Sequence, residues 1–346
     1  MAYWDARAVR GPSSRAEAAW PDAQQAGTAH PLGPIDVVYT WVDSADPAWR
    51  ERFDRGVSRR AAQASLATAE ERFLTRDELR YSLRSLHRYA QFVRRIFIVT
   101  DGQVPVWLNT GHPQIEVVDH RSIFPEPHVL PTFNPRAIEA CLHRIPGLSR
   151  YFIYFNDDVL LGRPVRPDAF FANGGAVVVR RQRSSRIEVA RESMDTRMWA
   201  SQNSLELVRR LTGKTPLLHT LAHTPCSLDR RLLEDVEEEF PADFAQIRAS
   251  TFRSRTDIKP ITLALMYALA TERGRLHDPD KQEFIHVTLG ARKMGQRLLQ
   301  IRRVNPTFYC LNSTPTHREV SLRRQSRIVG TFLADLLPES SPYERS

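Results

Sequence analysis

Two adjacent carboxylates and an amide follow an apolar stretch near the middle of the chain. Asn156, Asp157 and Asp158 come directly after the apolar run at 151–155. Adjacent carboxylates repel each other, and a hard divalent cation would relieve that repulsion. Mg²⁺ prefers oxygen ligands and is often held by one or two carboxylates together with substrate phosphates. The pattern predicts either a metal–diphosphate site or an ordinary structural turn, and the spacing alone leaves both interpretations open.

Three other side chains could take part in phosphate chemistry. His223 lies in a non-helical stretch, where a neutral imidazole could act as a general base and an imidazolium could hold phosphate. Arg253 precedes a helix predicted to begin at Thr256, and guanidinium groups beside free helix amides bind phosphate. Glu139 follows the apolar Ile138 on another predicted helix. A structural histidine, a surface arginine and a solvent-exposed glutamate are the alternative interpretations.

Several catalytic motifs are absent from the sequence. There is no GxGxxG fingerprint, Walker loop or GxSxG elbow, so hydride transfer and P-loop phosphoryl transfer lose support. Cys141, Cys226 and Cys310 are an odd, widely spaced set without a CxxC pair. We therefore expect small buried residues at these three positions rather than a disulfide framework or a zinc site.

A sheet must position the candidate residues. Strands are predicted at 35–42, 95–100, 115–118 and 151–155, with helices between them. One helix begins at a capping box over 75–78, and another runs from the N-cap Asn134 to Gly147. This alternation indicates the α/β class, with a mostly parallel Rossmann-like sheet and helices on both faces. Ligands bind beyond the carboxyl ends of such strands, and Asp157 and Asp158 lie at such an end.

The rest of the chain has a less regular pattern. We expect a mobile tail over 1–33 and one domain over 34–346, with a nucleotide half (34–165) and an acceptor half (166–346). In the second half, the pattern predicts a β-hairpin at 174–190 and helices at 192–212 and 228–239. A further helix is predicted from Thr256 to about Ala270, then a basic, glycine-broken stretch at 281–303 and a last helix at 317–336.

Composition limits the classes of partner. The chain has 346 residues, 42% of them hydrophobic, and a formal charge of +9. No window of 18 consecutive apolar residues and no signal peptide is present, so we expect a cytoplasmic protein. The positive charge suits nucleic acid, anionic lipid or a phosphorylated ligand. Because no nucleic-acid-binding motif is present, we expect no nucleic-acid partner. The sequence does not indicate an oligomeric state.

Taken together, the segments resemble the Stealth family. This family includes bacterial capsular-polysaccharide phosphotransferases and the catalytic subunit of the lysosomal-enzyme N-acetylglucosamine-1-phosphotransferase. It is described by four regions. The first resembles 35–43, the second includes 76–86, 96–103, 130–134, 137–139 and 154–159, the third runs from 223 to 257, and the fourth resembles 308–312. The closing stretch 336–344 is also similar, so the match spans about 35–345.

The resemblance implies a GT-A-like sheet and a sugar-1-phosphate transferase. Such an enzyme moves a hexose 1-phosphate, for example N-acetylglucosamine 1-phosphate, from a UDP-sugar to a glycan hydroxyl in capsule or cell-surface polysaccharide synthesis. A phosphodiester forms, UMP leaves, and Mg²⁺ or Mn²⁺ is expected. Family active-site positions fall on Glu139, Asp158, His223 and Arg253. We expect metal ligands at Asp158, Asp157 and Asn312, and a nucleotide pocket lined by Trp41, Asp43, Arg76, Asp77, Arg80, Asn134 and Asn156.

One residue departs from the family pattern, and two rival functions stay open. Ser313 stands where the fourth region often has an acid, so Asn312 would hold a metal with fewer charges nearby. The rivals are a conventional glycosyltransferase that releases UDP and a non-catalytic protein that binds polysaccharide or a membrane surface. Basic residues at 281–303 and in the final helix predict peripheral contact with the anionic inner membrane face; those of the helix are Arg318, Arg323, Arg324 and Arg327.

Overall fold

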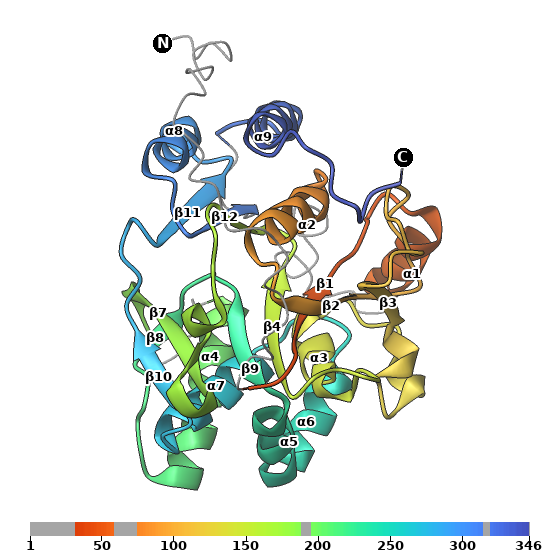
Figure 1. Ribbon diagram of the computed structural model, residues 1–346. Helices are drawn as coiled ribbons and strands as arrows, with labels where there is room; N and C mark the ends of the chain where they lie inside the picture. Colours follow the sequence, from red (N-terminus) through yellow and green to blue (C-terminus); the bar gives the residue numbers. More distant parts are fainter. Residues whose placement is uncertain (1–31, 59–74, 188–194, 314–318, 346) are drawn as a thin grey trace.

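A five-stranded sheet forms the centre of the protein (Figure 1). The computed structural model describes residues 32–58, 75–187, 195–313 and 319–345. The strand order is β3-β2-β1-β4-β9; the first four strands are parallel and β9 is antiparallel to β4. The bounds are β1 (Ile35–Thr40), β2 (Val93–Thr100), β3 (Ile115–Asp119), β4 (Tyr151–Asn156) and β9 (Cys226–Asp229). The predicted α/β class with a mostly parallel sheet is confirmed.

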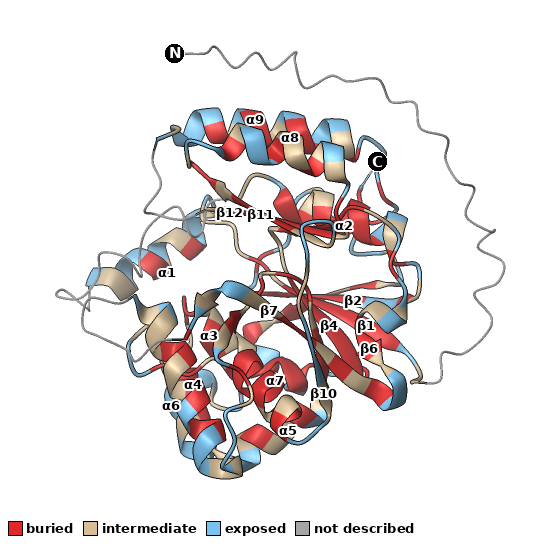
Figure 2. Ribbon diagram, turned by 90° about the vertical axis from the view of Figure 1, so that its left-hand side faces the viewer, coloured by how far each residue is buried: buried red, intermediate tan, exposed pale blue. Residues whose placement is uncertain are grey.

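Helices cover both faces of this sheet (Figure 2). Figure 2 shows α2, α8 and α9 above the sheet, α4 to α7 below it, and α1 to one side. The upper helices are α2 (Glu78–Tyr89), α8 (Met294–Val304) and α9 (Leu322–Leu336). The lower ones are α3 (Pro135–Glu139), α4 (Thr196–Thr212), α5 (Arg230–Glu239), α6 (Pro241–Arg248) and α7 (Pro260–Ala270). Nearly every side chain of α7 is buried, which matches its almost wholly apolar sequence.

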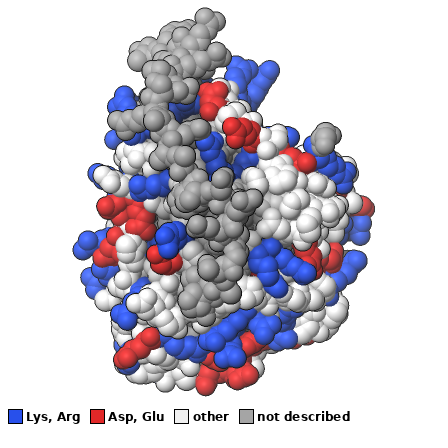
Figure 3. Space-filling view, in the orientation of Figure 1, with Lys and Arg blue, Asp and Glu red and all other residues white. Residues whose placement is uncertain are grey.

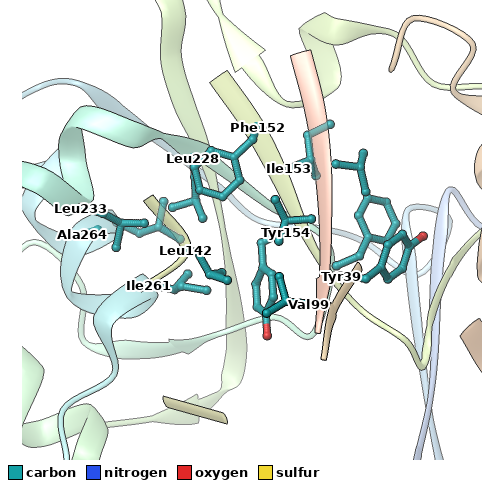
Figure 4. Packing of buried hydrophobic residues seen from close by; sticks show 14 of the residues in the cluster. Tyr39, Val99, Leu142, Phe152, Ile153, Tyr154, Leu228, Leu233, Ile261 and Ala264 are labelled. Atoms are coloured by element: carbon teal, nitrogen blue, oxygen red, sulfur yellow. The ribbon is translucent and has the colours of Figure 1, made fainter. Parts of the chain in front are cut away.

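The main core lies between the central sheet and the lower helices (Figure 4). Phe152 and Leu228, on the paired strands β4 and β9, pack on the same side as Leu233 of α5 and Ala264 of α7. Strands buried on both faces read as continuous apolar runs, as β1 does. Asp36 is the exception in β1. Its fully buried carboxylate accepts hydrogen bonds from the Arg94 guanidinium at 2.8 and 2.6 Å.

Two smaller sheets are formed largely by the second half of the chain. The first has the order β11-β12-β5, with β11 (Phe284–Leu289), β12 (Phe308–Ser313) and β5 (Val159–Leu161), and it packs with α8 and α9 around a second core. The other contains β7 (Ala176–Arg186), β10 (Gly274–His277), β6 (Phe171–Ala172) and β8 (His219–Leu221). Short 3₁₀ turns are η4 (His120–Ser122), η5 (Pro127–Val129), η6 (Leu142–Arg144), η7 (Pro167–Ala169) and η8 (Asn173–Gly175). Because β5 pairs with β12, strands from both predicted halves share one sheet.

Helix α1 (Pro47–Ser58) follows β1 and was not anticipated from the sequence. Its Trp49 and Phe53 stack with ring centroids 5.1 Å apart, and both meet Phe133 edge-on. Phe252 completes this small aromatic core. Phe133 and Phe252 lie far from α1 in sequence, so local patterns carry little signal for this cluster. Its packing fixes α1 beside the carboxyl ends of the central strands.

Several local predictions are wrong. Asp77, not Thr75, precedes α2, and it has a left-handed backbone (φ 63°) without a side-chain cap, so the capping box does not form. The helix predicted from Thr256 begins only at Pro260, because the Asp257 carboxylate is bound to Arg136 instead of capping a helix. The hairpin predicted at 174–190 is instead one strand, β7, which pairs with three other strands.

Other predicted boundaries shift or fall outside the described residues. The helix predicted from Asn134 to Gly147 ends as α3 at Glu139, and η6 follows it. Most of the predicted tail, residues 1–31, lies outside the described ranges, as does Arg318. Within those ranges, none of the helices is both long enough and apolar enough to cross a bilayer.

The final segment returns to α2. Glu344, whose side chain is 1% exposed, accepts a hydrogen bond from Arg84 Nη2 at 2.8 Å and pairs with Arg80. Arg84 also donates to the carbonyl oxygens of Leu337 and Pro338 at 2.8 and 3.3 Å. This buried network ties the segment after α9 to the upper face of the molecule.

Candidate active site

A cavity of about 190 Å³ opens at the carboxyl ends of the parallel strands. The strand order reverses at β1, because β2 and β3 lie on one side of it and β4 lies on the other. Such a switch point leaves a crevice in which ligands of open α/β sheets bind. The lining residues at or just beyond the carboxyl ends of strands are Thr40, Trp41 and Val42 (β1), Asp101 (β2), His120 (β3), Asn156, Asp157 and Asp158 (β4), and Leu311, Asn312 and Ser313 (β12). Arg76, Glu78, Trp49, Thr132, Phe133, Pro135, Ile138 and Arg253 complete the lining.

Carboxylates gather at the β4 end of this cavity. Asp158 Oδ2 accepts a hydrogen bond from Asn312 Nδ2 at 2.9 Å. Asp158 Oδ1 is buried, has no hydrogen-bond partner among the described residues, and lies 3.6 Å from His223 Nε2. Burial raises the pKa of Asp157 well above its ordinary value, and the neighbouring Asp158 and Glu78 carboxylates raise it further. Three acids in one buried place are costly without a compensating positive charge.

These residues fit a hard divalent cation. Asp157, Asp158 and Asn312 all line the cavity and carry the oxygen atoms that Mg²⁺ prefers. Buried polar atoms are nearly always paired, so the unpaired Oδ1 of Asp158 is a suitable ligand atom for a metal ion. Only one of the oxygens of this carboxylate is used by Asn312. Both the repulsion among the buried carboxylates and the oxygen atoms that these residues offer therefore favour a divalent cation.

His286 and Cys310 join His223 in a second group of potential ligands. Among the described residues, the ligand atoms of these three lie within 4.8 Å of one another. The register places His286 directly opposite Cys310 on the paired strands β11 and β12. Burial, together with His223, lowers the pKa of His286 to about 4, so its imidazole is neutral at physiological pH. Two imidazoles and a thiol suit a softer ion such as Zn²⁺.

This second group was not found by sequence reasoning. Its three donors come from three separate segments, so no ligand spacing along the chain could reveal it. Cys310 was interpreted only as a small buried residue, and His286 lies within the stretch that was described only as basic and broken by glycine. The signal that could have found them is the alternation of β11, which places His286 between the buried Ile285 and Val287.

A tightly bonded loop carries Arg253 to the cavity wall. The buried Asp257 carboxylate accepts hydrogen bonds from Arg136 Nη1 at 2.8 Å and from Asn134 Nδ2 at 3.0 Å. The same oxygen accepts from the Ser254 amide at 3.0 Å. Because Arg136 and Asn134 belong to the start of α3, these bonds fasten the loop around Arg253 to the lower layer. Sequence reasoning missed this positioning role of Asp257.

Glu139 lies behind the cavity wall and does not line it. Burial raises the pKa of Glu139, and the positive charges of Arg136 and Lys259 partly oppose that shift. Burial also lowers the pKa of Lys259 to about 7. Tyr154 hydrogen-bonds with Glu139, and its hydroxyl lies 2.9 Å from Thr40 Oγ1 in the cavity wall. The hydroxyl groups of Tyr154 and Thr40 thus connect Glu139 to the cavity by hydrogen bonds.

The residues predicted for the nucleotide pocket fall into two sets. Trp41, Arg76 and Asn156 line the cavity. The other four are engaged elsewhere. Asp43 caps the turn at Ala45 (2.8 Å), Asp77 precedes α2, Arg80 pairs with Glu344, and Asn134 caps α3 and holds Asp257. Four lining side chains, Trp49, Glu78, Asp101 and His120, were not predicted as site residues, although Asp101 and His120 both follow predicted strands.

Comparisons with known proteins agree with these observations. Models of Stealth protein conserved regions 1, 2 and 3 match residues 33–55, 72–179 and 222–270. An exopolysaccharide phosphotransferase of Streptomyces coelicolor is 40% identical over 90% of this chain and 52% of its own length. The exopolysaccharide phosphotransferase CpsY of Mycobacterium tuberculosis is 35% identical over 90% of this chain and 58% of its own length. The chain thus spans about half the length of the curated relatives it matches.

Solved structures with a similar arrangement are distant in sequence. A crystal structure of the galactosyltransferase LgtC with donor and acceptor sugar analogues aligns with a TM-score of 0.40 and 10% identity, covering 88% of this chain and 96% of the other. Mouse xyloside xylosyltransferase 1 aligns with a TM-score of 0.39 and 11% identity, covering 81% of this chain and 98% of the other.

The correspondence of residues 308–312 to the fourth family region stays a prediction. The three matched regions and the long alignments to curated relatives establish that this chain belongs to the Stealth protein family.

Proposed function

We propose that this protein transfers a sugar 1-phosphate from a UDP-sugar to a glycan hydroxyl during exopolysaccharide synthesis. The observation that carries the proposal is the grouping of Asp157, Asp158 and Arg253 in one cavity at the switch point of the sheet. Relatives named exopolysaccharide phosphotransferases support the same reaction class. Carboxylates that hold a cation and an arginine that faces phosphate are the groups that such a transfer needs.

The reaction forms one bond to phosphorus and breaks another. The acceptor hydroxyl oxygen attacks the phosphorus nearer the sugar, and the bond from that phosphorus to the bridging oxygen breaks. UMP leaves with the bridging oxygen, and the acceptor proton passes to a base on the protein. Such transfers depend chiefly on positioning and on stabilisation of the negative oxygens around phosphorus. The tethered loop at Arg253 suits that stabilising role, since Asp257 fixes its backbone.

Asp158, with Asp157 and Asn312, would hold Mg²⁺ or Mn²⁺. A bound ion would supply positive charge that offsets the negative charge of the diphosphate. The chain's own contribution is the orientation of these ligands. Asn312 donates to Asp158 Oδ2 and leaves Oδ1 directed toward the His223 side. Asn312 thus holds Asp158 in place without adding a negative charge, and with Ser313 beside it the proposed metal site has fewer charges than an acid at position 313 would give.

His223 and Glu139 are the two candidates for the base that takes the acceptor proton. His223 Nε2 is 3.6 Å from Asp158, so a proton held there would be stabilised by that carboxylate. Glu139 reaches the cavity only through Tyr154 and Thr40. Proximity favours His223. An attack by His223 itself, which would give a phosphohistidine intermediate, is the remaining alternative for this residue.

The product nucleotide tests the proposal. Incubation of the protein with candidate UDP-sugars, Mg²⁺ and an acceptor glycan should release UMP. Release of UDP instead would indicate a conventional glycosyltransferase. Absence of any nucleotide product across a broad panel of donors and acceptors would favour the non-catalytic binding protein.

We also infer peripheral contact with an anionic membrane face in the cytoplasm. Arg323, Arg324 and Arg327 are exposed on α9, and Arg303 is exposed on α8 beside it. Basic side chains are spread over the visible surface in Figure 3, with acids between them, including at the upper edge where α8 and α9 lie in Figure 1. Binding to anionic vesicles that weakens as salt rises would support this contact.

A further inference from the structure

His120 is a buried histidine whose ring nitrogens have no hydrogen-bond partner among the described residues. It begins η4 directly after β3, is 4% exposed and lines the cavity. Neither Nδ1 nor Nε2 makes a hydrogen bond to any residue that the structure describes. Buried polar atoms are nearly always paired, so an unpaired one in a cavity wall points to a partner that arrives from outside. The unpaired imidazole therefore marks a ligand contact at the β3 end of the cavity.

The imidazole of His120 is uncharged at physiological pH. Burial lowers its pKa to about 4, and the nearby carboxylates of Asp101 and Asp119 oppose this shift only in part. A neutral imidazole offers one N–H donor and one nitrogen acceptor. That pair is a poor match for phosphate, which favours cationic partners such as Arg253. It matches a neutral heterocycle that carries its own N–H donor and carbonyl acceptors.

The position of His120 along the sheet separates it from the acidic end. Strands β3 and β4 are separated by β2 and β1, which makes three interstrand spacings or about 14 Å. Asp158 follows β4 and His120 follows β3, so the cavity has an anionic end and a neutral polar end. One extended ligand that fills both ends must carry its charge at one end and a neutral polar group at the other. A nucleotide diphosphate sugar has this division.

A flat apolar wall lies beside the neutral end. Trp49 of α1 lines the cavity, and Arg52, one turn further along α1, binds Asp101 with Nη2 and Oδ2 2.8 Å apart. The Asp101 carboxylate opposes the lowering of the His120 pKa, so it lies near that imidazole. Its bond to Arg52 therefore holds the α1 segment that carries Trp49 at the same end of the cavity. Small-molecule sites combine such apolar walls with a few placed polar groups. An aromatic wall and a neutral donor–acceptor group are what a planar base requires.

We propose that His120 recognises the heterocyclic base of the nucleotide donor and selects uracil over cytosine. Uracil carries a hydrogen on ring nitrogen N3, and the unprotonated nitrogen of His120 would accept it. Cytosine has no hydrogen on N3, so that bond would be lost, and a contact with cytosine N3 would require the other tautomer of the imidazole. This inference rests on the proposed function, because it assigns one end of the same donor site.

Calorimetric titration of the full chain with UDP and CDP, each with Mg²⁺, tests the assignment. The wild-type protein should bind UDP about 10-fold or more tightly than CDP, since one lost hydrogen bond in a buried site has at least that effect. His120→Phe keeps a buried ring but removes both nitrogens, and it should bring the CDP-to-UDP ratio of dissociation constants close to one. His120→Gln keeps a donor and an acceptor and should retain part of the preference. Thermal melting of each variant establishes that it is folded.

Two controls make the outcomes distinguishable. Asp158→Asn removes charge at the other end, so it should weaken both nucleotides alike and leave their ratio unchanged. If both His120 variants fold and keep the wild-type ratio, the assignment of His120 is overturned while the donor site stands. If the wild-type protein binds neither nucleotide, the proposed function fails and the assignment fails with it. Should His120→Phe not fold, the ratio in His120→Gln decides: a ratio equal to that of the wild type contradicts the assignment.

Discussion

His223 Nε2 lies 3.6 Å from Asp158 Oδ1, a carboxylate oxygen that accepts no hydrogen bond from the part of the chain that the structure describes. The two residues are 65 positions apart in the numbering, yet the antiparallel pairing of β9 with β4 brings them together. Cys226, three residues after His223, pairs with Tyr154 near the end of β4. The carboxyl end of β4 therefore places an imidazole beside Asp158, which lines the cavity, although His223 itself is not among the lining residues.

Loss of either member of this pair should reduce turnover far more than binding. We expect His223→Ala to lower kcat by about 10²- to 10⁴-fold, the range typical of a lost proton-transfer group. Asp158→Asn should also lower kcat, because it removes a carboxylate proposed to hold the divalent cation. Steady-state kinetics with a UDP-sugar and an acceptor glycan would measure this. His112→Ala is a matched control, because that imidazole packs edge-on against Tyr343 on another part of the molecule. Wild-type turnover in both site variants would remove His223 and Asp158 from the mechanism.

Asp257 should act on catalysis through Arg253. Its carboxylate holds Arg136, Asn134 and the Ser254 amide, and Arg253 precedes that amide. Asp257→Asn should therefore lower kcat/KM by about 10-fold in the wild-type background but by less than about 3-fold in an Arg253→Ala background, because coupled residues are not additive. Glu206→Gln, on the exposed side of α4, is the control. Equal effects in both backgrounds would indicate that Asp257 has no positioning role toward Arg253.

The central sheet could be predicted from the sequence because its strands are short apolar runs that end in polar residues. The same feature located Asp157 and Asp158, since acids that follow a buried parallel strand stand at the ligand-binding edge. The predictions failed where a side chain had a distant partner. Asp257 looked like part of a helix start but binds Arg136 on α3, and Thr75 looked like a cap although Asp77 precedes α2. Local propensity cannot report such long-range bonds.

The missed site residues have a similar cause. His286 and Cys310 face each other only through the pairing of β11 with β12. Trp49 reaches the cavity because α1 packs on Phe133, whose position depends on the fold of the whole lower layer. Asp43, Arg80 and Asn134 have the residue types of a nucleotide site, and each makes a bond within the protein: Asp43 to the Ala45 amide, Arg80 to Glu344 and Asn134 to Asp257. Residue type and order alone do not distinguish a capping acid from a cavity-lining one.

Glu344 should contribute acid-sensitive stability. Burial alone would raise its pKa, but hydrogen bonds from Arg84, the Ser341 amide and Arg80 outweigh burial and lower the pKa from 4.5 to about 2. A carboxylate with a lowered folded-state pKa stabilises the protein above its unfolded pKa, and the contribution is lost as the pH falls from about 4.5 to about 2. A shift of this size corresponds to about 3 kcal/mol.

Glu344→Gln therefore should lower the free energy of unfolding by about 3 kcal/mol at pH 7 and by almost nothing near pH 2. Denaturant titrations of the wild type and the variant at several pH values would measure the difference. Glu339→Gln changes an exposed acid of the same segment and should have little effect at any pH. A difference for Glu344→Gln that stays constant between pH 5 and pH 2 would contradict this account.

Removal of divalent cations should abolish turnover, and Mg²⁺ or Mn²⁺ should restore it. If Asp158 and Asp157 hold the ion, Asp158→Asn should raise the Mg²⁺ concentration for half-maximal activity by about 10-fold or more. Cys310→Ser distinguishes the two potential ligand groups, because Mg²⁺ prefers oxygen while the group of His223, His286 and Cys310 suits a softer ion. An unchanged Mg²⁺ requirement is expected for Cys310→Ser. A large increase in that variant alone would move the essential ion to the second group.

The fate of the phosphorus nearer the sugar tests the central claim most directly. A UDP-sugar that carries radioactive phosphorus at the β position can be incubated with the protein, Mg²⁺ and an acceptor glycan, and the products separated by size. Sugar-1-phosphate transfer predicts that the label enters the polymer, that it resists phosphatase there, and that unlabelled UMP accumulates. Accumulation of labelled UDP without any label in the polymer would contradict the account.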